Sequence, residues 1–195
     1  MSRVPIREAL RLLESQGVVT SEPYKGIRLM EVSHRRLHQV LDVRVNLENL
    51  AARRAIEAKA NNAAGIERLK QARTEMAIRA SIGDGYAFAL ADAAFHRVLV
   101  DLGGNPVLAG LWESLARQVT IIVGLSTLAK SMASIVEEHD LLIEAFEAGD
   151  KRNMEKLLHD HIVVLSEQVD FDTMIEKKRR EREEFKPARR PKRDK

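Results

Sequence analysis

The chain of 195 residues contains no cysteine, and only 4% of its residues are aromatic. Without cysteine it has no disulfide, no thiol nucleophile and no thiolate ligand, so any metal must be held by nitrogen and oxygen atoms. No apolar run approaches the roughly 18 residues needed to span a bilayer, and the N-terminal segment lacks the apolar stretch of a secretory signal. These absences predict a cytoplasmic protein without a membrane partner.

The remaining composition is typical of a globular protein that can bury a core, with 45% hydrophobic and 31% charged residues. The net charge of +3 is unevenly spread, because residues 1–30 carry five basic and three acidic side chains, residues 31–175 carry 16 and 21, and residues 176–195 carry 11 and five. The basic ends could meet phosphate, although charge runs are usually just solvated.

The first 30 residues predict a short helix followed by a hairpin. Ile6, Leu10 and Leu13 recur at helical spacing, and Gly17 stands where a helix would stop. Two short β-branched runs then flank a turn rich in proline and glycine at residues 22–26, which is the pattern of a small hairpin.

Beyond residue 33 the periodicity is helical throughout, which predicts a mainly all-α protein with an antiparallel bundle of six to seven helices. The predicted helices span about 33–60, 62–82, 85–102, 105–131, 133–148 and 151–173. After residue 175 the sequence is too polar to bury a core, so a disordered basic tail is expected at 176–195. The domain boundaries that follow are 1–30, 31–175 and 176–195.

The first helix carries residues that suit DNA recognition. Ser2, Arg3 and Arg7 lie in its first turns, where arginine could bond a guanine edge and the helix N-terminus could hold a phosphate. Lys25 and Arg28, near the hairpin tip, could contact the DNA backbone. By residue type alone, a solvated helix face is the stronger interpretation.

The run SRVPIREALRLLESQGVVTSEPYKGIRL resembles the recognition helix and wing of GntR-type transcriptional regulators. The resemblance implies that Ser2, Arg3 and Arg7 contact DNA and that Gly26, next to Lys25, forms the wing turn. In that family two further helices precede this helix, so we expect a partial winged helix-turn-helix in a chain whose start is assigned too far downstream or whose gene is truncated. On that expectation the chain binds DNA weakly unless the two helices are supplied.

The helical region carries a candidate metal site. Asp92 and His96 are four residues apart and therefore share one helical face. His139 and His161 each lie among apolar neighbours, which predicts that both point inward, whereas His159 faces away from that apolar stripe. A histidine on an apolar face can also be a hydrogen-bonded core residue, and the residues alone leave both interpretations open.

Residues 33–170 resemble the all-helical FCD domain, the ligand-sensing domain of FadR-like GntR regulators, through the segments around Asp92–His96, GNPVL and EHDLLIEAFEAGD. The resemblance implies a divalent ion held by Asp92, His96, His139 and His161. This donor set suits zinc, nickel or manganese and leaves coordination positions open for a carboxylate or hydroxyl.

Arg44 matches the arginine that faces the effector pocket in this family, where a guanidinium would pair with a carboxylate. The alternative is a surface arginine that pairs with Glu48, four residues along the helix.

The predicted function is therefore a DNA-binding transcriptional regulator that a small organic acid controls through a metal-containing helical domain. We expect a homodimer on a pseudo-palindromic operator. One alternative is a ligand-sensing or dimerisation module that cannot bind DNA. A metal-dependent hydrolase is less favoured, because Glu138 points a different way round its helix from His139 and no nucleophile motif is present. We predict that the protein is not an enzyme.

Overall fold

The computed structural model describes residues 3–15, 17–22, 24, 26–29, 34–127 and 130–164, together with positions 173, 176 and 180. Ser2, Lys25 and most of the predicted tail lie outside the described residues. The elements in chain order are α1 (Arg3–Ser15), β1 (Val19–Glu22), β2 (Gly26–Leu29), α2 (His34–Glu57), α3 (Ala63–Ile82), α4 (Gly85–Leu102), α5 (Pro106–Ser126), α6 (Met132–Glu147), α7 (Lys151–His159) and the π-helix η1 (Asp160–Val164). The predicted fold class, mainly all-α with a small hairpin, is confirmed.

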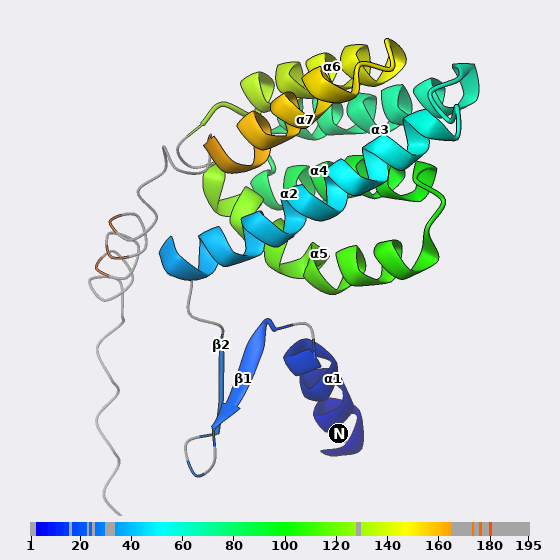
Figure 1. Cartoon of the computed structure of the whole chain (residues 1–195). Helices are drawn as coiled ribbons and strands as arrows, with labels where there is room; N and C mark the ends of the chain where they lie inside the picture. Colours follow the sequence, from blue (N-terminus) through cyan, green and yellow to red (C-terminus); the bar gives the residue numbers. More distant parts are fainter. Residues whose placement is uncertain are drawn as a thin grey trace, which may run out of the picture.

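The N-terminal elements form a small unit beside α5 (Figure 1). Gly17 follows α1 with a φ of +66°, in the left-handed region that glycine adopts without strain. β1 and β2 pair antiparallel, with Val19 opposite Leu29 and Glu22 opposite Gly26, and the turn brings Gly26 to a φ of +80°. The first strand begins one residue later than the predicted β-branched run and extends to Glu22.

The helices of the bundle begin and end where polar residues and glycine interrupt the apolar pattern. Asn62 and Asp84 cap α3 and α4 by accepting backbone N–H bonds with their side chains, and Asp150 does the same for α7. Gly83 closes α3 with a φ of 79°. These caps explain why the predicted bounds of α3 and α4 and the predicted start of α7 agree with the observed ones to within a few residues. The helix predicted over 105–131 ends earlier, at Ser126.

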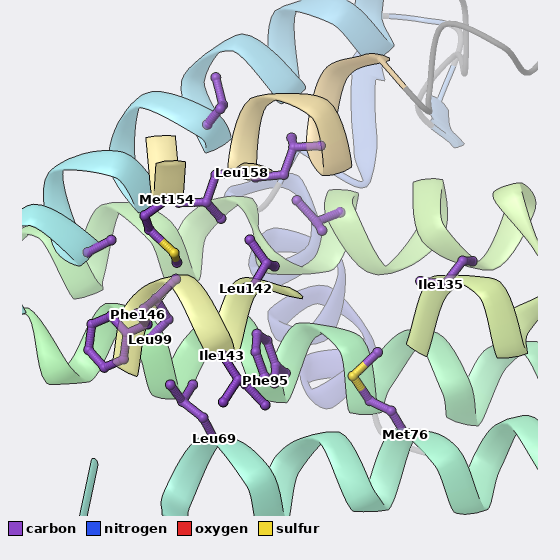
Figure 2. Close-up of a cluster of buried hydrophobic side chains, with 14 of the residues drawn as sticks. Leu69, Met76, Phe95, Leu99, Ile135, Leu142, Ile143, Phe146, Met154 and Leu158 are labelled. Carbon is purple, nitrogen blue, oxygen red and sulfur yellow. The ribbon is translucent and has the colours of Figure 1, made fainter. Parts of the chain in front are cut away.

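Helix α2 crosses the bundle and contacts α4, α5 and α7, whereas α3 packs between α4 and α6 (Figure 1). The main core gathers residues from α2 through α7, including Phe95, Leu99, Ile143, Phe146 and Leu158 (Figure 2). A second buried cluster surrounds Trp112, where α2, α4 and α5 meet. Residues of α2 belong to both clusters.

Helix α5 departs from the sequence prediction. Its stretch Pro106–Gly124 has a mean hydropathy of 1.2 and is long and apolar enough to cross a membrane by length and composition alone. The expectation that no segment approaches this threshold is therefore wrong. Leu108, Trp112 and Val119 are buried in the bundle, as in the core helix of a globular domain.

The glycines in helices yield a stability prediction. A Cβ at Gly65 would lie 2.0 Å from the carbonyl oxygen of Ala60, so Gly65→Ala must displace backbone. We expect it to lower the free energy of unfolding by about 1–3 kcal/mol in a urea titration. Gly110, which has no atom within 4 Å of such a Cβ, is the control, and Gly110→Ala should raise stability by about 0.5–1 kcal/mol. Equal stability of the two variants would contradict this account.

Candidate metal centre

The structure brings four predicted donors together: Asp92 and His96 from α4, His139 from α6 and His161 from η1. One ligand atom from each lies within 4.8 Å of the others. The Nε2 atom of His96 is 3.2 Å from that of His139 and 3.3 Å from that of His161, and His139 Nε2 is 3.4 Å from a carboxylate oxygen of Asp92. Asp92, His96 and His139 are fully buried, and the side chain of His161 is 8% exposed.

The π-helix sets the direction of His161. The predicted single helix over 151–173 is wrong at this point, because α7 ends at His159 and residues 160–164 continue with π geometry. Such wider turns inside helices are frequent at functional sites. His161 consequently faces the cluster, while the side chain of His159 is 55% exposed and lies outside it.

The Nδ1 atom of each imidazole lies within hydrogen-bond distance of an oxygen atom that is not part of the cluster. His96 Nδ1 lies 2.6 Å from Glu48 Oε2, His139 Nδ1 lies 2.8 Å from the Ile135 carbonyl oxygen, and His161 Nδ1 lies 2.8 Å from Glu138 Oε2. Carboxylate and carbonyl oxygens accept hydrogen bonds, so the ring proton belongs at Nδ1 and Nε2 carries a lone pair. This is the outer hydrogen bonding that orients histidine ligands toward a metal.

The electrostatics of the cluster favour the protonation states that bind metals. Burial lowers the pKa of His161 to about 4, and the charge of His139 adds to this effect. Burial also lowers the pKa of His96, although Glu48 opposes the shift. Burial alone would raise the pKa of Asp92, but its neighbours, among them the permanently charged guanidinium of Arg44, hold it well below its usual range. Asp92 is therefore ionised, and His96 and His161 are neutral near pH 7.

A buried ion pair adjoins the cluster. Arg44 Nε donates to Glu48 Oε1 at 2.8 Å, and Arg44 Nη2 lies 3.8 Å from Asp92. The indole Nε1 of Trp112 donates to the same Glu48 oxygen at 2.9 Å. Burial would raise the pKa of Glu48, but Arg44 and His96 hold it well below its usual range. Arg44 therefore pairs with Glu48, as one of the two sequence interpretations predicted, but the pair lies in the interior and not at the surface.

Sequence reasoning gave Glu48, Trp112 and Glu138 no place in the site. Glu48 could have been noticed, because it interrupts the apolar stripe of Leu41, Val45 and Ala52 on α2. Glu138 does point away from His139, but it reaches His161 instead and forms an ion pair with Lys130. The sequence prediction considered Glu138 only as a general base, so its contact with His161 was not foreseen.

A cavity of about 40 Å³ opens beside the cluster, lined in part by Arg44, Asp92, Lys130 and His161. Arg44 Nη2 and Asp92 Oδ2 are buried and have no hydrogen-bond partner among the described residues. Buried polar atoms of this kind usually indicate an absent ligand, ion or water. The space suits a few atoms, and Lys130, whose side chain is 22% exposed, stands at its outer side.

Among the described residues, those predicted to meet DNA belong to α1 and β2 and are not part of this cluster. Arg7 is exposed on α1, and Gly26 is exposed at the start of β2. Arg3 begins α1, while Ser2 and Lys25 fall outside the described residues.

The structure thus consists of a helical domain with a candidate metal centre, joined to a helix–hairpin unit. The FCD domain family matches residues 39–163, which is more than half of the chain, so the protein belongs to that family. It is similar to a protein of Paenarthrobacter nicotinovorans named "Probable D-xylose utilization operon transcriptional repressor", with 29% identity covering 83% of this chain and 70% of the relative. A gluconate operon transcriptional repressor of Bacillus subtilis is 22% identical over 87% and 71% of the two chains.

Solved structures show the same fold. E. coli McbR/YncC superposes with a TM-score of 0.70 at 22% identity and covers 87% of both chains. A GntR transcriptional regulator from Rhodococcus sp. RHA1 gives 0.69 at 17% identity, covering 86% of this chain and 80% of its own. The predicted membership is confirmed: the chain is a GntR-type transcriptional regulator with an FCD domain.

The buried ion pair yields a second prediction. Glu48→Ala leaves the guanidinium of Arg44 largely uncompensated, so we expect it to lower the free energy of unfolding of the metal-free protein by about 3–5 kcal/mol. Glu57→Ala is the matched control on the same helix, because Glu57 pairs with Lys151 in solvent. That change should leave stability nearly unaltered. If urea titrations give the two variants the same midpoint, the stabilising contribution assigned to Glu48 is contradicted.

Proposed function

We propose that the protein senses a small organic acid at a metal centre in its FCD domain and thereby controls DNA binding by its N-terminal unit. One observation carries this proposal. With each ring proton at Nδ1, three imidazole lone pairs and the Asp92 carboxylate converge in a buried space. Electron-pair donors packed in this way repel one another, and a cation at their centre removes the repulsion.

The four residues fit a divalent ion. Asp92, His96, His139 and His161 supply one oxygen and three nitrogen ligands, a set that suits zinc, nickel or manganese. When bound, such an ion would supply positive charge and open coordination positions for a carboxylate or hydroxyl group. Glu48 and Glu138 would orient the rings of His96 and His161.

Arg44 would bind the carboxylate of the effector. Arg44 lines the cavity, its Nη2 atom is buried without a hydrogen-bond partner among the described residues, and its Nε is held by Glu48. This geometry presents a pre-oriented donor to an incoming acid. The relatives named as repressors of gluconate operons support a response to an organic acid.

For DNA binding we propose residues 1–30, with α1 in the major groove and the hairpin as a wing. Arg7 projects from α1 into solvent, where a base edge could meet it. Residues 31–175 would form the sensor, and a cytoplasmic homodimer would place two such units on a pseudo-palindromic operator.

The metal proposal is tested by elemental analysis of protein purified without added metal. We expect one divalent ion per chain, and a loss of metal from His139→Ala because that change removes one of four ligands. His159→Ala is the control, since His159 lies outside the cluster, and it should retain the metal. Equal metal content in parent and His139→Ala would remove His139 from the centre.

The role of Arg44 is tested by calorimetry of the metal-loaded protein against lactate, gluconate and malonate. Arg44→Ala should weaken the binding of the acid that the parent binds by about 1.5–3 kcal/mol, the contribution of a charge-assisted hydrogen bond, without releasing the metal. Arg53→Ala, an exposed change on the same helix, should bind as the parent does. Unchanged affinity in Arg44→Ala would exclude Arg44 from the effector site.

DNA recognition is tested by mobility shift with a chimera that carries two further N-terminal helices from a GntR relative. Arg7→Ala should cost about 1–3 kcal/mol and relax base preference, because a base contact is lost. Arg11→Ala is the control, since Arg11 pairs with Glu8 on the same helix. Lys25→Ala should weaken binding to all sequences alike and lower the salt slope by about one. A loss in Arg7→Ala that is the same for every sequence would contradict base readout.

A further inference from the structure

The chain has one tryptophan, and it lies between the candidate metal centre and the N-terminal unit. Trp112 on α5 is 2% exposed and donates its indole N–H to Glu48 Oε1 at 2.9 Å. The other oxygen of Glu48 lies 2.6 Å from His96 Nδ1. A single carboxylate therefore connects the indole to one of the rings that face the cluster.

The other side of Trp112 faces the helix–hairpin unit. It lines a groove of about 480 Å³ together with Leu13 of α1 and Val18, which precedes β1. Ala116 and Thr120, one and two turns further along α5, line the same groove. Helix α5, whose Trp112 is hydrogen-bonded to Glu48, thus also lines the groove that it shares with the N-terminal unit.

A second contact fixes the α1–β1 turn to the same helix. Gly17 approaches Gln118 so closely that an added Cβ would lie 2.7 Å from its Nε2 atom. Gln118 is 4% exposed, and its Oε1 accepts a hydrogen bond from Arg36 Nη2 at 2.9 Å. The N-terminal unit therefore rests on α5 at two places, the Trp112 groove and the Gln118 contact.

We propose that Glu48 and Trp112 are positioning residues that couple occupancy of the metal cluster to the seating of the α1–β1 segment on α5. This inference rests on the proposed function, because it requires a cation at the cluster. It names the route by which the sensor would act on the DNA-binding unit.

The coupling follows from how Glu48 divides its hydrogen bonds. With a cation at Nε2 of His96, the Nδ1–H of that ring becomes a stronger donor to Glu48. The carboxylate then shifts toward His96, and its bond from Trp112 weakens. Because interiors are close-packed, a displaced indole shifts α5, which shares the groove with Leu13 and Val18 and whose Gln118 approaches Gly17.

The single tryptophan makes the first step directly observable. Titrating the metal-free protein with zinc should change the Trp112 emission saturably, with one zinc per chain. Zinc is used as the probe because it is d¹⁰ and has no redox chemistry of its own, unlike many open-shell ions. His159→Ala should respond as the parent does, and His139→Ala should not respond at low zinc. Emission that stays constant while calorimetry shows zinc binding would overturn the inference and leave the metal proposal standing.

The second step is tested by hydrogen exchange at the α1–β1 turn. The amide of Val18 donates to the Leu13 carbonyl, so its exchange reports how that segment is held. We expect zinc to change its exchange rate by about tenfold in the parent, within the usual range of allosteric coupling. In Trp112→Phe, which keeps an aromatic ring but lacks the N–H, that effect should disappear while zinc affinity stays within about tenfold of the parent.

Leu111→Ala is the matched control, because Leu111 is the neighbouring residue on α5 but is 54% exposed and does not line the groove. It should keep the zinc effect on Val18. An equal zinc effect in Trp112→Phe and the parent would overturn the role of Trp112. Failure of the parent to bind zinc in calorimetry would overturn the metal proposal and this inference together.

Discussion

The buried carboxylate of Glu48 is the interaction on which the rest of the structure depends. Three donors from three helices converge on it: the guanidinium of Arg44, the indole of Trp112 and the ring of His96. A lone charge in this position would be very costly, so each partner is needed to stabilise the others. The same contacts fix the tautomer of a metal-facing histidine and aim an arginine at a cavity.

Much of this arrangement could be predicted from local patterns. Capping residues such as Asn62 and Asp84 define helix ends within a few residues, and the spacing of Asp92 and His96 puts both on one face. The inward direction of His139 follows from its apolar neighbours. The similarity to GntR regulators then supplied the expectation that donors far apart in the sequence meet.

Other features depend on three-dimensional context that no short pattern contains. The roles of Trp112 and Glu138 arise from contacts with residues 64 and 23 positions away. The change from α to π geometry after His159 has no sequence signature of its own, and its surroundings are distant in sequence: the turn packs against α2, and His161 reaches His96 on α4 and Glu138 on α6. The apolar character of α5 was underestimated because two charged residues interrupt a stretch that is otherwise long enough for a membrane span.

Because His161 lies in the π-turn, its direction depends on the number of residues in that turn as well as on the residue type. The wider turn takes in one residue more than an α-turn would, so deleting or inserting a residue within Asp160–Val164 would change which side chain of this segment faces the cluster. Relatives could therefore gain or lose a cation through a one-residue insertion or deletion, with all four donor residues still present in the gene. A search for this centre in related genomes should accordingly count spacing around the last histidine, since the residue types alone would misassign some of them.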